Sequence, residues 1–465
     1  MNGFSPREHA PSILVASLSV AFGVALLQAT DALSQVIAAN DTLGASGMVQ
    51  LVLTMVAFVF LAIATYVGAV VTANTFATII AGRTRTIALM RLIGASARAQ
   101  RAAVSREGLL VGIFGAIIGM VVGTAVTVAV VTIGVAVHFM PALPYSFFEP
   151  VILVPVFGVL LTTWLASWVG SRKVLTVSPM QAISAGAASR EEVARHRGRN
   201  IAASILFILG IALLLLGALV GLVNPGGVLI GVLGGMLSFT GLVLGSQLVM
   251  PPALRLVGLL LGKSAPARLA AENAVRYPER ASRTTIGIVI GVTLVTMFAV
   301  ATGSFQEVFA VSAGMDPEDL AEAQQPLLVV VVIFSVLIGF SALIAAVGMV
   351  NNLSLSVMQR TRELGLLRAL GFTARQLRGM ITAESAQLTT AAVLVGLVLG
   401  TFYGWAGAQS LLGTVTGGPA FVAPSMPLWL LGTLIGSAAV LTLVASLAPA
   451  RRATRIAPIT ALAVE

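Results

Sequence analysis

The chain has 465 residues, of which 58% are hydrophobic and only 9% are charged, and its formal net charge is +10. Soluble globular domains carry about a quarter charged residues, so this composition excludes a soluble protein and predicts an integral membrane protein. The sequence holds no cysteine, which excludes disulfide bonds and thiolate metal sites.

Ten apolar runs follow one another along the chain, and each is long enough to cross a bilayer, since a spanning helix needs roughly 20 mainly apolar residues. The third and ninth runs are longer than one crossing requires, which predicts a tilted helix or a helix that continues beyond the membrane. The sequence therefore predicts an all-α polytopic membrane protein with ten transmembrane helices. The runs cover residues 11–31, 49–73, 108–138, 150–170, 201–222, 227–249, 284–304, 326–350, 385–411 and 427–449.

All 27 Lys and Arg residues fall on one side of this arrangement. The charged residues in the segments on the other side are all acidic, such as Asp31 and Glu307. Cytoplasmic loops of membrane proteins are enriched in Lys and Arg, so both termini are predicted to be cytoplasmic. The basic charge is interpreted as a signal of topology and of contact with anionic lipids, and no nucleic-acid partner is expected.

The polar segment after the second run, residues 74–107, predicts a helix-turn-helix that we call the first elbow. Apolar spacing continues through this segment as far as Ile93, which indicates that the second span extends into the cytoplasm as a helix. Gly94 predicts a helix stop, and Ser96 predicts the N-cap of the next helix. That next helix leads directly into the third run.

A second elbow, residues 351–384, repeats the first at an offset of 277 positions without a gap. Nine of the first twenty aligned positions are identical in GRTRTIALMRLIGASARAQRA, which begins at Gly82, and QRTRELGLLRALGFTARQLRGM, which begins at Gln359. The second copy adds a candidate capping box between Thr373 and Gln376. Runs one to four and seven to ten are therefore interpreted as two copies of one four-span unit.

Runs five and six have no counterpart in either unit and form a predicted hairpin with an Asn-Pro-Gly-Gly turn at 224–227. Two extra crossings give both units the same orientation, so the repeats are predicted to be parallel and not inverted. The predicted domains are the first unit at 1–182, the linker and hairpin at 183–265, and the second unit at 266–465. Residues 265–282 predict an amphipathic helix lying on the inner leaflet.

The sequence offers no catalytic residues, metal cluster or bound cofactor. Its three histidines lie in separate segments, and no phosphate-binding loop is present, so the chain is not expected to be an enzyme or to hydrolyse nucleotide itself. Glu107 and Glu384, aligned by the same offset of 277, stand at the starts of the third and ninth runs. The two glutamates either pair with arginines of the neighbouring loops or take part in a conformational relay.

Gly115, Gly119 and Gly123 recur at a spacing of four along the third run. Small residues at this spacing let membrane helices approach closely. The stripe indicates either ordinary packing within the chain or a seam that moves or faces a partner.

The motif RTRELGLLRALG at 360–371 and the closing motif ARRATRIAPITAL at 450–462 resemble the permease subunits of the FtsX/MacB-like superfamily of ABC transporters. The resemblance implies a permease of the bacterial cytoplasmic membrane that has no nucleotide site and docks a separate ABC ATPase, in two copies, which uses the ATP. The elbows would form the docks. The residues expected to carry docking are Arg83, Arg85, Arg91, Gly94 and Arg98 in the first elbow, and Arg360, Arg362, Glu363, Arg368, Gly371 and Arg375 in the second.

The expected function is ATP-driven extrusion or extraction of an amphiphile such as a lipid, lipopeptide or antimicrobial compound, because no hydrophilic pathway is evident in the spans. The outer segments that hold large domains in many relatives are only about 17 and 21 residues long here. A signal-transmitting scaffold and an ion-coupled carrier are the alternatives. Parallel repeats and uncharged spans disfavour the carrier. Glu363, which stands where the first elbow has Thr86, predicts unequal docks.

Overall fold

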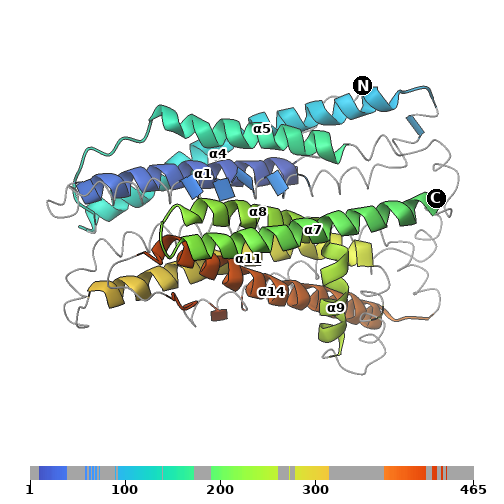
Figure 1. Cartoon of the computed structure of the whole chain (residues 1–465). Helices are drawn as coiled ribbons and strands as arrows, with labels where there is room; N and C mark the ends of the chain where they lie inside the picture. The colour runs from blue at the N-terminus through green and yellow to red at the C-terminus, as the bar shows by residue number, and fades with distance from the viewer. Residues whose placement is uncertain are drawn as a thin grey trace.

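The computed structural model describes residues 10–38, 93–138, 140–171, 190–259, 278–313, 371–414 and 421–426, with single residues or pairs at 58–90, 272 and 431–436. The longer elements in these ranges are all helical (Figure 1). They are α1 (Ala10–Ala38), α4 (Ala97–Ala136), the 3₁₀ turn η1 (Pro150–Ile152), α5 (Leu153–Gly170), α7 (Arg190–Val220), α8 (Gly227–Leu244), α9 (Ser246–Gly258), α11 (Pro278–Ala313) and α14 (Ala374–Leu412).

Seven of the described helices are long and apolar enough to cross a membrane. They correspond to the first run, the third to seventh runs and the ninth run, which confirms an all-α, multi-pass membrane protein. The runs at 49–73, 326–350 and 427–449 lie wholly or largely outside the described residues. The number of ten spans therefore remains a prediction from the sequence, as do the domain boundaries.

The two longest helices occupy equivalent places in the two units. α4 has 40 residues and α14 has 39, whereas roughly 20 residues suffice for one crossing. Each begins 11 residues before its predicted apolar run. The second helix of each elbow and the span that follows it therefore form one continuous helix, as the sequence predicts.

Several helix boundaries differ from the predicted limits of the spans, and α11, for example, continues to Ala313, nine residues beyond the predicted end at 304. α1 continues to Ala38, seven residues beyond the predicted end of the first span. Asp31 indicated a loop by its polarity, but Gln35 Nε2 donates to Asp31 Oδ2 at 2.8 Å, one helical turn away, and satisfies the carboxylate within the helix. The sixth span ends at Leu244 and not at 249, and a separate helix, α9, follows after the single residue Gly245.

The helices form a bundle in which α1, α4 and α5 lie together and α7, α8, α11 and α14 form a second group (Figure 1). α4 and α14 begin at the same end of this bundle, which we call the elbow end, and α9 runs across the helices there. The hairpin turn lies at the opposite end. Asn224 Oδ1 accepts from Gly226 N at 2.7 Å, which confirms the predicted turn.

The glycine stripe of α4 packs against α1 within the chain. A methyl group on Gly119 would lie 2.6 Å from Val20 Cβ, so the two helices touch through the bare backbone. The second unit repeats this contact: a methyl group on Gly396 would lie 2.7 Å from Val292 Cβ on α11. Gly119 and Gly396 are 277 positions apart, and Val20 and Val292 are 272 apart. The internal repeat is therefore present in the packing as well as in the sequence.

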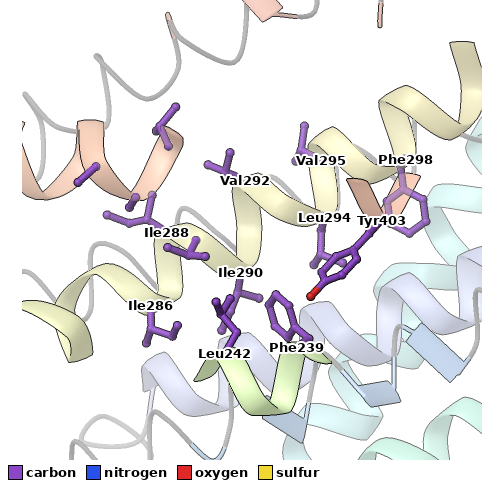
Figure 2. Close-up of a cluster of buried hydrophobic side chains, with 14 of the residues drawn as sticks. Phe239, Leu242, Ile286, Ile288, Ile290, Val292, Leu294, Val295, Phe298 and Tyr403 are labelled. Atoms are coloured by element: carbon purple, nitrogen blue, oxygen red, sulfur yellow. The ribbon is translucent and has the colours of Figure 1, made fainter. Parts of the chain in front are cut away.

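One large apolar cluster joins the two units and the hairpin. Figure 2 shows the part of it in which Phe239 and Leu242 of α8 lie beside apolar side chains of α11. At its centre Phe22 of α1 meets Phe298 of α11, with ring centroids 6.2 Å apart. Phe239 of α8 lies against Tyr403 of α14, with centroids 6.3 Å apart and an edge-on geometry. The hairpin is therefore part of the core, although it has no counterpart in the repeats.

Candidate functional site

The first elbow turns at Gly94, whose φ of 101° lies in the region that favours glycine. Leu89 and Met90 are helical, Ile93 N donates to Leu89 O at 3.2 Å, and Ala95 N donates to Met90 O at 3.0 Å. This last bond spans six residues and is the signature of a Schellman helix stop. The predicted end of the incoming helix is confirmed.

α4 then begins with the predicted N-cap. Ser96 has extended φ and ψ angles of −72° and 146°, and its Oγ accepts from Ala99 N at 3.1 Å. The cap satisfies one of the backbone N–H groups that a helix start leaves without a partner. Together with the glycine stop, it fixes the direction in which the chain leaves the elbow.

The second elbow adopts the same backbone geometry in the residues that the structure describes. Gly371 has a φ of 98°, and the N-cap Thr373 has φ and ψ angles of −72° and 156°. Here the capping box is complete, because Gln376 N donates to Thr373 Oγ1 at 3.2 Å and Thr373 N donates to Gln376 Oε1 at 2.9 Å. The sequence prediction of this box is confirmed, and α14 starts with one more satisfied donor than α4.

Large apolar side chains are exposed at the first elbow. Ile93 is 81% exposed, and Leu89 and Met90 are half exposed. These three residues, which we call the apolar elbow surface, lie on the turn just before Gly94. From the sequence, Ile93 served only to extend the incoming helix, and no exposed contact surface was predicted, although Leu89 is one of the positions that the repeat preserves in Leu366. Exposed apolar groups that lie together mark a contact with another protein or with the membrane.

Arg98 and Arg375 were predicted as docking residues, and both are exposed in the first turn of their helices, at equivalent positions of the repeat. Their guanidinium groups are accessible to a partner at the elbow end. The remaining predicted docking residues lie outside the described residues, namely Arg83, Arg85, Arg91, Arg360, Arg362, Glu363 and Arg368.

Arg101 has a different role from Arg98. Its guanidinium lies over the ring of Trp168 near the end of α5 and donates to the Trp168 carbonyl oxygen. This arginine is preserved in the repeat as Arg378, and the sequence alone gave no signal that it packs within the chain. The contact connects the first elbow helix to the fourth span.

Glu107 and Glu384 are half-buried at the elbow ends of α4 and α14, and each has an interaction within the chain. Their side chains stand about three turns into long helices, close to the level at which the apolar runs begin. The relay remains a prediction. Among the described residues no group of three or more His, Asp or Glu side chains could hold a metal ion.

Known proteins resemble this chain over short stretches. The macrolide export ATP-binding/permease protein MacB of Nitrobacter winogradskyi is 34% identical over 131 residues, which are 28% of this chain and 19% of that protein. The uncharacterized ABC transporter permease YknZ of Bacillus subtilis is 33% identical over 129 residues, which are 27% of this chain and 30% of that protein. The chain therefore matches less than a third of the length of either relative.

A family model gives a broader match. The FtsX-like permease C-terminal domain matches residues 58–179 and again residues 335–458, which together make up more than half of the chain. Each match contains one elbow, and the two matches begin 277 positions apart, which is the offset of the internal repeat. The chain belongs to the FtsX-like permease family and carries two copies of its C-terminal domain.

Proposed function

We propose that this protein is the permease subunit of an ABC transporter, and that it uses ATP hydrolysis by a separate ATPase to extrude an amphiphilic compound from the membrane. The observation that carries the proposal is the pair of elbows, whose described residues share a positive-φ glycine and a capped helix start, and from which α4 and α14 leave at the same end of the bundle. A dimeric ATPase would present two like surfaces to these two docks. The similarity to a protein named ATP-binding/permease supports coupling to an ATPase.

The apolar elbow surface and the exposed arginines suit a dock of mixed character. Burying the Ile93 side chain against a partner would contribute about 1.5 to 3 kcal/mol. Exposed ion pairs contribute only about 0 to 1 kcal/mol each, so the arginines would add little affinity. Their charge would instead orient the partner. Ile93 is therefore expected to carry more of the affinity than Arg98.

The long helices offer a route from the docks into the membrane. Each elbow is fixed to a helix of about 40 residues, so a push at the elbow moves the whole helix. The glycine seams hold α4 against α1 and α14 against α11. The two units meet through side chains such as Phe22 and Phe298. Closure of the ATPase dimer would push on both elbows and rock one unit against the other at this contact.

The nature of the described spans favours an amphiphilic cargo. Their middle portions are apolar apart from buried hydroxyl side chains such as those of Thr127, Ser238 and Thr296. A pathway for a hydrophilic solute would need charged groups or a wet channel at mid-membrane. A compound with an acyl chain can instead move along the lipid-facing surface of the bundle.

Docking can be tested by co-expressing the full chain in turn with each ABC ATPase subunit of its own genome and purifying the complex. Ile93→Ser should lower the affinity for the bound ATPase about 10- to 100-fold, because the substitution removes most of the apolar area that the partner would cover. Val223→Ser is the matched control, because Val223 is 86% exposed at the opposite end of the bundle. Equal effects of the two substitutions, or no ATPase that binds, would contradict the proposal.

Cargo movement can be tested with the purified complex in liposomes that contain a fluorescent phospholipid or a fluorescent cationic lipopeptide. Extrusion predicts ATP-dependent loss of the probe from one leaflet. Hydrolysis that is stimulated by the permease but moves neither probe would favour the signal-transmitting scaffold.

A further inference from the structure

α9 is a short helix that the sequence did not predict, and both of its faces are apolar. Met250, Leu254 and Val257 are buried against α11 and α14. The opposite face is exposed, with Leu256 at 67%, and Leu259, the C-cap residue that follows the helix, is 82% exposed. Large apolar side chains gathered on an exposed face mark a membrane or protein contact, so the outward face of α9 needs an apolar environment.

The hydrogen bonds of α9 fix its depth relative to the spans. Ser282 Oγ donates to Ser246 O at 3.1 Å, and Gln387 Nε2 donates to Leu254 O at 2.8 Å. Arg199 donates to the Gln247 side chain.

The three partners of α9 stand on three different helices, and each lies two residues from the start of an apolar run. Arg199 precedes the run at 201, Ser282 precedes the run at 284, and Gln387 follows the start of the run at 385. Apolar runs begin where the hydrocarbon region begins. Both ends of α9 are therefore held at this one level, and the helix lies in the plane of the membrane boundary, across the bundle as Figure 1 shows.

The one charged residue on the outward face of α9 is Arg255, which is exposed among Leu248, Leu256 and Leu259. Apolar side chains with a basic residue beside them are the pattern of a helix that lies at a lipid surface. The arginine can reach phospholipid headgroups while the leucines enter the acyl region. Three leucines exposed side by side favour a lipid-facing surface over a water-facing one.

We propose that α9 is an interfacial anchor whose outward face lies among anionic phospholipids of the leaflet at the elbow end, while its inward face braces the bases of α11 and α14. The anchor would hold the second unit at a fixed depth next to the second elbow. This inference concerns the permease alone and does not depend on ATPase docking.

Spin labels on single cysteines test the depth directly, because the chain has no cysteine of its own. Leu256→Cys reports on α9, Ile208→Cys marks the lipid-facing middle of α7, and Ala99→Cys marks water at the first elbow. The accessibility of each spin label to oxygen and to a water-soluble nickel complex is measured in vesicles of phosphatidylcholine and phosphatidylglycerol. The ratio of the two should place the label at position 256 about 5 to 10 Å below the membrane surface. Water-like accessibility equal to that of the Ala99 label would overturn the proposal.

The lipid preference is tested with a fluorophore at Leu259→Cys and quencher-labelled phospholipids, again without ATPase. Arg255→Gln should reduce the preference for phosphatidylglycerol over phosphatidylcholine about fivefold, as expected for one basic residue at a charged surface. Arg197→Gln, an exposed arginine of α7 at the same end, should leave the preference unchanged. An unchanged preference in Arg255→Gln would overturn the assignment of anionic lipid to this face.

Discussion

The Arg101 guanidinium carbon lies 4.2 Å from the centre of the Trp168 ring, and Arg101 Nη2 donates to the Trp168 carbonyl oxygen at 3.3 Å. Arg101 is in the second turn of α4, and Trp168 is two residues from the end of α5. The pair therefore joins the helix that leaves the first elbow to the span that returns to the same end of the bundle. Any movement of the elbow would be passed to α5 through this contact.

We expect a double-mutant cycle between Arg101→Gln and Trp168→Leu to give a coupling energy of about 0.5 to 1 kcal/mol, the range of a cation-π contact at an accessible site. The measurement is the free energy of unfolding of the purified permease in mixed micelles. Arg106→Gln serves as the control, since Arg106 is exposed on the same helix. A coupling energy near zero would mean that the stacking does not link the two helices.

The duplicated seam predicts that Gly119→Ala and Gly396→Ala destabilise the permease to a similar extent. Alanine by itself favours a helix by about 0.5 to 1 kcal/mol over glycine, but overpacking at a tight contact costs about 1 to 3 kcal/mol. Gly407→Ala is the control, because a methyl group there meets nothing within 4 Å. Thermal unfolding should show a lower midpoint for the two seam variants only, and a stabilised Gly396→Ala variant would contradict the close approach.

Gly371→Ala is expected to destabilise the second elbow through backbone strain, with no steric clash. A methyl group at Gly371 also meets nothing within 4 Å, but its φ of 98° costs an L-residue about 1 to 2 kcal/mol. Gly379→Ala, in a regular part of α14 with equally open surroundings, should be neutral or stabilising. Hydrogen exchange of the first turns of α14 measures the difference, and identical protection in both variants would show that the turn relaxes without cost.

The side of the membrane on which each end of the bundle lies is predicted from the distribution of basic residues. In intact cells, Asn224→Cys should react with an impermeant thiol reagent, and Arg197→Cys should react only after permeabilisation. Both side chains are exposed, and the natural chain contributes no thiol. Labelling of both positions from outside would rule out the predicted orientation.

Local signals in the sequence were sufficient to predict the turns and the helix caps. Gly94, Thr373 and Asn224 act on their immediate neighbours, and each has the predicted conformation. α9 could not be predicted because Pro251 and Pro252 indicate a break in a helix, whereas packing against α11 and α14 supports a helix through them.

Contacts between distant segments could not be predicted from the sequence either. The spacing of Gly119 predicts close packing, but only the structure identifies α1 as the helix it meets. The same holds for Arg101, which resembles the docking arginines in type and repeat position but packs on Trp168. The exposure of Ile93 depends on where the elbow turns, so its place in the candidate dock required coordinates.

Site-directed photo-crosslinking tests the central claim most directly. A photoreactive amino acid is placed at Ile93 or, as the matched control, at Val223, and the complex with the co-expressed ABC ATPase is irradiated. Both positions are more than 80% exposed, at opposite ends of the bundle. The account predicts a permease-ATPase crosslink from Ile93 and none from Val223. The absence of a crosslink from Ile93 in a complex that still hydrolyses ATP with permease stimulation would contradict docking at the elbow.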